Sequence, residues 1–151
     1  MSHFSPFSKE ELLPQEEMLE IKRQKGELFI GLPKETYLGE KRVCLTPDAV
    51  TALTSHGHRI VIETGAGDGA NYTDKEYSEA GAKISYDVEE AFKCKIVLKV
   101  APPTEEEIEY INPQTILISS LQLKTQSKKY FEQLSKKRIT AVAFDFIKDD
   151  H

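Results

Sequence analysis

The feature of this 151-residue chain that most limits its fold is the alternation of short apolar runs with helix-like segments. The runs are continuously apolar, as expected of strands that are buried on both faces of a sheet. They are Leu28–Leu32, Arg59–Ile62, Ile96–Val100, Thr115–Ile118 and Thr140–Phe144. The alternation predicts right-handed βαβ units and therefore an α/β domain of three αβα layers with a mostly parallel sheet.

Cap signals mark where the intervening helices begin. We predict N-terminal caps at Thr46, Thr73, Thr104 and Thr125. A proline follows Thr46 at the first helical position, where its missing N–H is harmless. Thr73 and Thr104 each have a glutamate three residues later, which completes a capping box.

Residues 1–26 differ from the rest of the chain and are predicted to form an N-terminal helical extension that ends at Gly26. They are rich in charge and keep only a thin apolar stripe, made of Leu12, Leu13, Met18, Leu19 and Ile21. Such a stripe suits a helix packed on the surface or on a partner subunit. Residues 27–151 are then one domain.

Composition excludes several classes of protein. The net charge of −5 argues against a general nucleic-acid binder, which needs a cationic surface. The basic cluster Lys128, Lys129, Lys136, Lys137 and Arg138 is interpreted as a solvated helix face. We find neither a signal peptide nor an apolar run near the ~20 residues of a membrane span. With two isolated cysteines and no zinc-ligand spacing at its histidines, the chain is expected to be soluble, cytoplasmic and metal-free.

Ligands of parallel sheets bind beyond the carboxyl ends of the strands, so the segments that follow the strands were searched for chemistry. Gly65–Ala70 follows a strand and reads GxGxG, which departs from the GxGxxG dinucleotide fingerprint. Asp68 would also place a negative charge close to a pyrophosphate. We interpret this loop as a tight backbone bend, with phosphate binding as the less favoured alternative.

Three charged residues are the best candidates for a substrate site. Arg42, in a polar loop, can grip a small carboxylate with two hydrogen bonds, or can be an ordinary surface arginine. Glu35 can orient Arg42 or be solvated. Lys99 stands inside an apolar run, where an unpaired ammonium is costly. It is therefore either a site lysine or one half of a structural ion pair.

Four segments in this order resemble the N-terminal domain of the alanine dehydrogenase / nicotinamide nucleotide transhydrogenase family. They are Ile30–Glu35, Arg42–Pro47, Glu63–Gly67 and Leu98–Pro103. The resemblance covers about residues 28–147. It implies a Rossmann-like or flavodoxin-like domain on the substrate side of a larger enzyme. The domain that binds NAD or NADP would then lie beyond this chain, and no cofactor is expected here.

The resemblance carries over residue by residue. The family's carboxylate-binding arginine matches Arg42. Its catalytic lysine and histidine match Ala101 and Gln122, and neither can act as a general acid or base near neutral pH. We expect Lys99, Gln122 and Glu35 to join Arg42 in substrate contacts.

Several functions remain open on this basis. The first is part of an alanine dehydrogenase, which converts L-alanine, NAD and water to pyruvate, ammonium and NADH. The second is a transhydrogenase α-subunit domain, since that branch also lacks the lysine and histidine. The third is a non-catalytic oligomerisation or binding module, and a saccharopine dehydrogenase relative ranks last. The expected partners are the missing nucleotide-binding domain, a small-molecule substrate and further copies of the chain.

Overall fold

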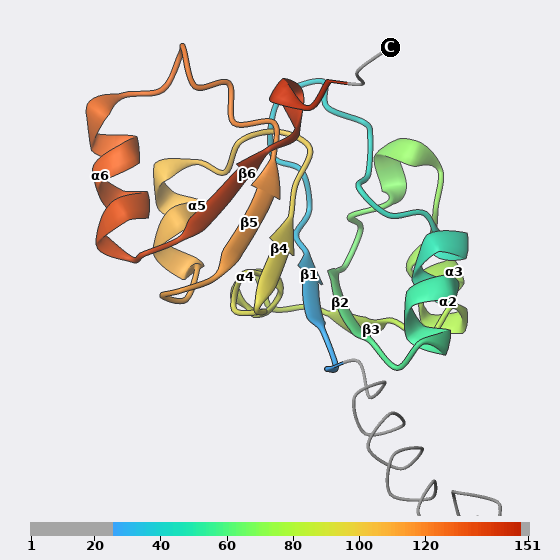
Figure 1. The fold of residues 1–151 in the computed structure, drawn as a ribbon. Helices are drawn as coiled ribbons and strands as arrows, with labels where there is room; N and C mark the ends of the chain where they lie inside the picture. The colour runs from blue at the N-terminus through green and yellow to red at the C-terminus, as the bar shows by residue number, and fades with distance from the viewer. Residues whose placement is uncertain (1–25, 149–151) are drawn as a thin grey trace, which may run out of the picture.

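A computed structural model describes residues 26–148, and these form a six-stranded sheet flanked by helices (Figure 1). The strands are β1 (Phe29–Leu32), β2 (Arg59–Glu63), β3 (Lys83–Ser85), β4 (Ile96–Leu98), β5 (Ile116–Ser119) and β6 (Thr140–Ala143). Their order is β3-β2-β1-β4-β5-β6, and every neighbouring pair is parallel. The predicted α/β fold with a parallel sheet is confirmed.

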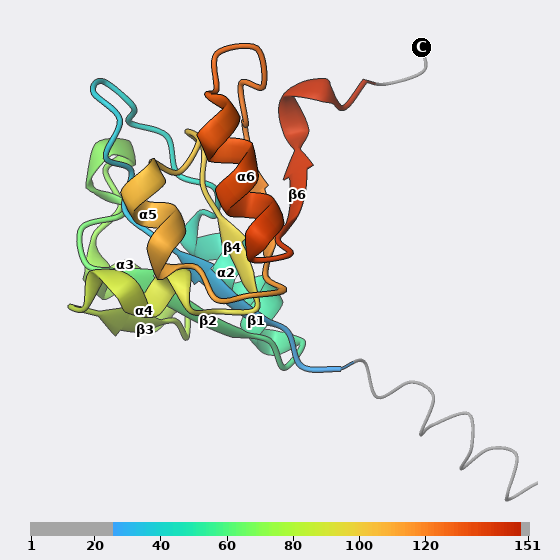
Figure 2. The same ribbon diagram turned by 90° about the vertical axis from the view of Figure 1, so that its left-hand side faces the viewer.

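Helices occupy both faces of the sheet (Figure 2). They are α2 (Pro47–Ser55), α3 (Asp74–Glu79), α4 (Val88–Phe92), α5 (Glu105–Tyr110) and α6 (Lys128–Lys136), with short 3₁₀ turns η1 (Asp68–Ala70) and η2 (Phe144–Phe146). Three of the predicted caps are in place, at Thr46, Thr73 and Thr104. Both predicted capping boxes are formed.

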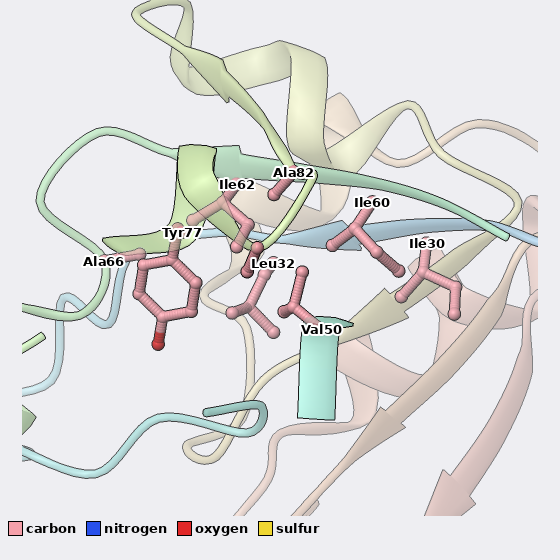
Figure 3. Packing of buried hydrophobic residues seen from close by; sticks show 9 residues of the cluster. Ile30, Leu32, Val50, Ile60, Ile62, Ala66, Tyr77 and Ala82 are labelled. Atoms are coloured by element: carbon pink, nitrogen blue, oxygen red, sulfur yellow. The ribbon is translucent and has the colours of Figure 1, made fainter. Parts of the chain in front are cut away.

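Two large apolar clusters, with a third small one of Val61, Ala91 and Cys94, hold the layers together. On one face, Ile30 and Leu32 of β1 pack with Ile60 and Ile62 of β2 against Val50 of α2 (Figure 3). The other large cluster joins β4 and β5 to α4, α5 and α6 through Phe92, Val97, Ile108, Ile111, Leu117, Leu121, Tyr130 and Leu134. Alternate residues of each strand therefore serve opposite faces, as the pleat requires.

The glycine in the central strand lets a helix approach closely. A Cβ atom at Gly31 would lie 1.8 Å from the carbonyl oxygen of Ala91, in α4. No other residue fits between β1 and α4 without moving backbone.

The layer formed by α2 and α3 covers β1, β2 and β3 and leaves the same face of β4, β5 and β6 open (Figure 1). Leu98 and Ile118 are paired across β4 and β5 on that face and are only half-buried. Val142 of β6 is 38% exposed. Part of this open apolar half-face, including Leu98 and Ile118, lines the candidate site.

Four details differ from the sequence prediction. The run that forms β6 was expected to be buried on both faces, but Thr140, Ala141 and Val142 are exposed because β6 is an edge strand. Strand β3 and helix α4 were not predicted. The helix expected to begin after Thr125 is capped instead by Ser127, whose hydroxyl accepts the Tyr130 N–H. The Thr125 hydroxyl donates to the carbonyl of Gln122, in the preceding turn.

The basic cluster is only partly a solvated face. The Lys137 ammonium donates to the carbonyls of Ile108, Glu109 and Ile111 at 2.8, 2.6 and 3.0 Å, and so satisfies the C-terminal end of α5. Lys129 pairs with Glu105 at the other end of the same helix. These lysines thus join α6 to α5.

The predicted helical extension over residues 1–26 lies almost wholly outside the described residues and stays a prediction. Among residues 26–148 no helix has the length and hydropathy to cross a membrane.

Candidate functional site

A mostly apolar pocket with Arg42 in its lining lies at the carboxyl-terminal ends of β4 and β5. Its volume is about 330 Å³. It is lined by Arg42, Val43, Cys44, Leu98, Val100, Ile118 and Phe144. The loop after β1 supplies the first three of these residues, while β4, β5 and the segment after β6 supply the rest. Arg42 is the charged member of this lining.

The guanidinium of Arg42 is held by a residue that the sequence analysis missed. Its Nε and Nη2 atoms donate to the two carboxylate oxygens of Glu40 at 2.9 and 2.8 Å. The backbone N–H of Arg42 donates to the same carboxylate at 2.9 Å. These hydrogen bonds, led by those from the side chain, lower the pKa of Glu40 to about 2. The pair is therefore ionised throughout the physiological range.

Glu35 neither orients Arg42 nor is solvated, and it is not among the residues that line the pocket where substrate contacts were expected. Its carboxylate is 8% exposed and accepts the N–H groups of Val100 and Ala101 at 2.6 and 3.2 Å. It thereby fixes the backbone that leaves β4, at the point where β1 and β4 separate. The residue that orients Arg42 is Glu40.

Lys99 is an ion-pair lysine, one of its two expected roles. The ammonium is 1% exposed and lies 3.4 Å from Glu35 and 3.5 Å from Glu107. Its neighbours Leu98 and Val100 line the pocket, and alternation along the strand places Lys99 on the other face of the sheet, next to α5. The structure therefore does not bring Lys99 together with Arg42.

Glu107 is the second residue that the sequence analysis missed at this edge. Its carboxylate accepts the Thr36 hydroxyl and the Thr104 N–H, both at 2.9 Å, and also approaches Lys99. The capping-box signal located this glutamate at the start of α5 but gave no sign of its burial. Glu35, Lys99 and Glu107 together tie the exits of β1 and β4 to α5.

The two positions that the resemblance matches to the family's acid–base residues lie at the same end of the sheet. Ala101 is buried. Gln122 is exposed and has a left-handed backbone with φ of 48°. Its N–H donates to the Asp145 carboxylate at 3.3 Å. Gln122 is not part of the pocket lining, and neither position supplies an acid–base group.

Cys44 lines the pocket but is not a nucleophile at neutral pH. Burial, and then the nearby charge of Glu35, raise the pKa of its thiol to about 12. The thiolate needed for nucleophilic attack is therefore scarce. Among residues 26–148 no set of three histidine, cysteine or carboxylate side chains is arranged to hold a metal ion.

The glycine loop after β2 uses its amides internally. The Asp74 carboxylate accepts the Thr64 hydroxyl at 2.6 Å and the Gly65 N–H at 2.9 Å. The N–H groups of Ala66, Asp68 and Ala70 donate to the carbonyls of Glu63, Gly65 and Gly67, so most of the loop's amides are engaged within the chain. Gly67 and Gly69 are required by packing, since a Cβ atom there would lie 2.5 Å from the Tyr77 ring and 2.9 Å from the Lys41 backbone. This geometry favours the tight-bend interpretation.

Comparison with known proteins identifies relatives over most of the chain. A family model described as "Alanine dehydrogenase/PNT, N-terminal domain" matches residues 31–151. The alanine dehydrogenase of Bacillus subtilis is 36% identical over 122 residues, which are 81% of this chain and 32% of the relative. That of Staphylococcus saprophyticus is 35% identical over 120 residues, which are 80% of this chain and 32% of the relative.

Solved structures give the same picture. A structure of L-alanine dehydrogenase superposes with a TM-score of 0.76 at 34% identity, over 80% of this chain and 33% of that one. A transhydrogenase from Sinorhizobium meliloti superposes with a TM-score of 0.71 at 26% identity, over 78% of this chain and 35% of that one. The chain spans about a third of the length of the relatives that it matches.

Proposed function

Since the chain belongs to the alanine dehydrogenase/PNT N-terminal domain family, we propose that it is the substrate-side domain of an NAD(P)-dependent oxidoreductase resembling alanine dehydrogenase. In the longer protein, L-alanine, NAD and water would give pyruvate, ammonium and NADH. The higher identity to the L-alanine dehydrogenase structure, 34% against 26% for the transhydrogenase, supports this branch.

The observation that carries the proposal is the guanidinium of Arg42 in the lining of a small apolar pocket. A carboxylate on the guanidinium would place a short carbon chain against Val100 and Ile118. Pyruvate and alanine each have one carboxylate and one methyl group, and so fit both parts of the site.

The domain's role in the reaction is to bind and orient. Hydride transfer between the alanine Cα and the nicotinamide needs the nucleotide, which the missing domain would hold at reacting distance. Ala101 and Gln122 offer no group that could take up or release a proton near neutral pH. Lys99 is committed to Glu35 and Glu107. We therefore assign proton transfer to water or to side chains other than Ala101, Gln122 and Lys99.

The loss of both acid–base residues also supports a second candidate, a transhydrogenase α-subunit domain. Hydride transfer between two nicotinamide nucleotides requires no proton transfer to a keto acid. The full-length protein distinguishes the candidates, because this branch predicts transfer from NADPH to an NAD analogue without any response to pyruvate and ammonium. A protein that binds nucleotide but turns over neither pair would be the oligomerisation module instead.

The direct test is to titrate pyruvate into the 151-residue chain and to monitor binding through the amide chemical shifts in NMR spectra. We expect the shifts to move at Val43, Val100 and Ile118, and Arg42→Gln to abolish the response. Arg59→Gln is the matched control, because Arg59 is also exposed and paired with a glutamate. It lies at the amino-terminal end of β2, at the end of the sheet opposite to the pocket. Equal loss in both variants, or none in Arg42→Gln, would remove Arg42 as the carboxylate site.

Turnover is tested separately. The chain alone should form no NADH from alanine and NAD, since it spans about a third of its relatives' length and the proposal places the nucleotide on another domain. Clear turnover by the purified chain would overturn the assignment of the reaction to two domains.

A further inference from the structure

Glu40 leaves only part of Arg42 available to a ligand. A guanidinium carries five N–H donors along two edges, either of which matches a carboxylate. Glu40 occupies the edge formed by Nε and Nη2, at 2.9 and 2.8 Å. A ligand carboxylate therefore has to use the edge that includes Nη1. Both carboxylates would then lie on one guanidinium.

The Glu40 carboxylate is a fixed part of the site. Its side chain is 11% exposed, whereas that of Arg42 is 75% exposed. A third hydrogen bond, from the backbone N–H of Arg42, holds the carboxylate against its own loop. The pKa of about 2 keeps it charged at every pH at which the protein would work. A binding ligand therefore meets a permanent negative charge beside its own.

This charge acts differently on ligands of different charge. With one negative charge, a ligand is attracted by Arg42 and repelled by Glu40, and its bidentate hydrogen bonds decide the outcome. A second negative charge on the ligand meets an arginine that is already neutralised by Glu40. The remaining lining named for the pocket is uncharged: Val43, Cys44, Leu98, Val100, Ile118 and Phe144.

We propose that Glu40 is a specificity-determining residue that restricts the Arg42 site to monocarboxylates and excludes dicarboxylates and phosphate esters. The proposal rests on the proposed function, since it assumes that Arg42 binds the substrate carboxylate. It adds that the substrate class is set by charge repulsion from Glu40 as well as by attraction to Arg42.

The test compares two stable ligands that differ by one carboxylate, lactate and malate, titrated into the chain at low salt and followed by NMR. Removing the Glu40 charge should favour malate more than lactate. We expect Glu40→Gln to shift the ratio of the two dissociation constants toward malate by about two- to fivefold, the range of exposed charge pairs. The shift should fall at high ionic strength because exposed charges are screened.

Comparing two ligands removes the effect of a less ordered Arg42, because loss of orientation weakens both ligands alike. Glu40→Asp, which keeps the charge, should keep the wild-type ratio. Glu27→Gln is the matched control, because Glu27 pairs with Arg59 at the far end of the sheet, and it should leave the ratio unchanged.

The outcomes separate this inference from the proposed function. Lactate binding that depends on Arg42, with the same ratio in wild type and Glu40→Gln, would overturn the role of Glu40 and leave the carboxylate site standing. Absence of lactate and pyruvate binding in the wild-type chain would overturn both. A ratio that shifts in Glu40→Gln and Glu40→Asp alike would show a steric effect and would also overturn the proposal.

Discussion

Replacing Lys99 by methionine tests whether buried ion pairs hold the edge of the site together. The ammonium is 1% exposed and lies between Glu35 and Glu107, whose side chains are 8% and 9% exposed. Methionine keeps most of the apolar volume but leaves both carboxylates without their cation. Removing one partner of a buried pair costs about 3–5 kcal/mol, so we expect Lys99→Met to lower the free energy of unfolding by about that amount.

Lys128 provides a control that differs mainly in burial. Its ammonium lies 3.5 Å from Glu132, the distance between Lys99 and Glu107, but its side chain is 92% exposed. An exposed pair of this kind contributes about 0–1 kcal/mol, so Lys128→Met should change stability by no more than that. Both variants are measured by urea unfolding, followed by circular dichroism.

A double variant checks the cause of the loss. If Lys99→Met destabilises because it leaves charges unpaired, adding Glu107→Gln removes one of those charges and should regain part of the stability. The reasoning is refuted if Lys99→Met costs no more than Lys128→Met, or if the second substitution only adds to the loss.

Three further predictions concern other contacts. Among residues 26–148 the buried Tyr130 hydroxyl has no hydrogen-bond partner, so Tyr130→Phe should leave the melting temperature unchanged or raise it. Tyr77→Phe, by contrast, removes a 2.8 Å hydrogen bond to the carbonyl of Leu45 and should cost about 1–2 kcal/mol. Lys137→Met removes three hydrogen bonds to the end of α5 and should cost about 1.5–3 kcal/mol in urea unfolding. Arg42→Gln should raise the pKa of Glu40 from about 2 toward its ordinary 4.5, as read by carboxyl ¹³C NMR. Because the folded pKa is depressed, the stability that this pair contributes is present above pH 4.5 and is lost as the pH falls toward 2.

The sequence located β1, β2, β4, β5 and β6, because continuous apolar runs can be recognised without the fold. The first four are largely buried, whereas the edge strand β6 is mostly exposed. The sequence analysis missed β3, in which Ile84 is the single apolar residue of Lys83–Ser85. As an edge strand it is defined by its pairing with β2, a contact between distant segments. It also missed α4, whose five residues are too few to show a helical period.

The site was predictable in its residue types but not in its pairings. The polar loop and the resemblance both pointed to Arg42, yet the partner of Arg42 depends on a turn at Gly39, where φ is 83°. That turn folds the loop so that Glu40 and Arg42 face each other. Lys99 was recognised as unusual from its apolar neighbours, but the carboxylates that surround it come from segments 64 residues before and 8 residues after it.

The sheet is joined unevenly at its centre. Strands β1 and β2 share four register pairs, whereas β1 and β4 share two. Beyond those two pairs the strands part, and the Glu35 carboxylate, from the segment after β1, accepts the N–H groups of Val100 and Ala101 just after β4. The two halves of the sheet are thus joined by two register pairs within the strands and by the Glu35 carboxylate where the strands end. Because Lys99 and Glu107 bridge the same exits of β1 and β4, substitution of Glu35 alone is expected to loosen this end of the sheet without separating its two halves.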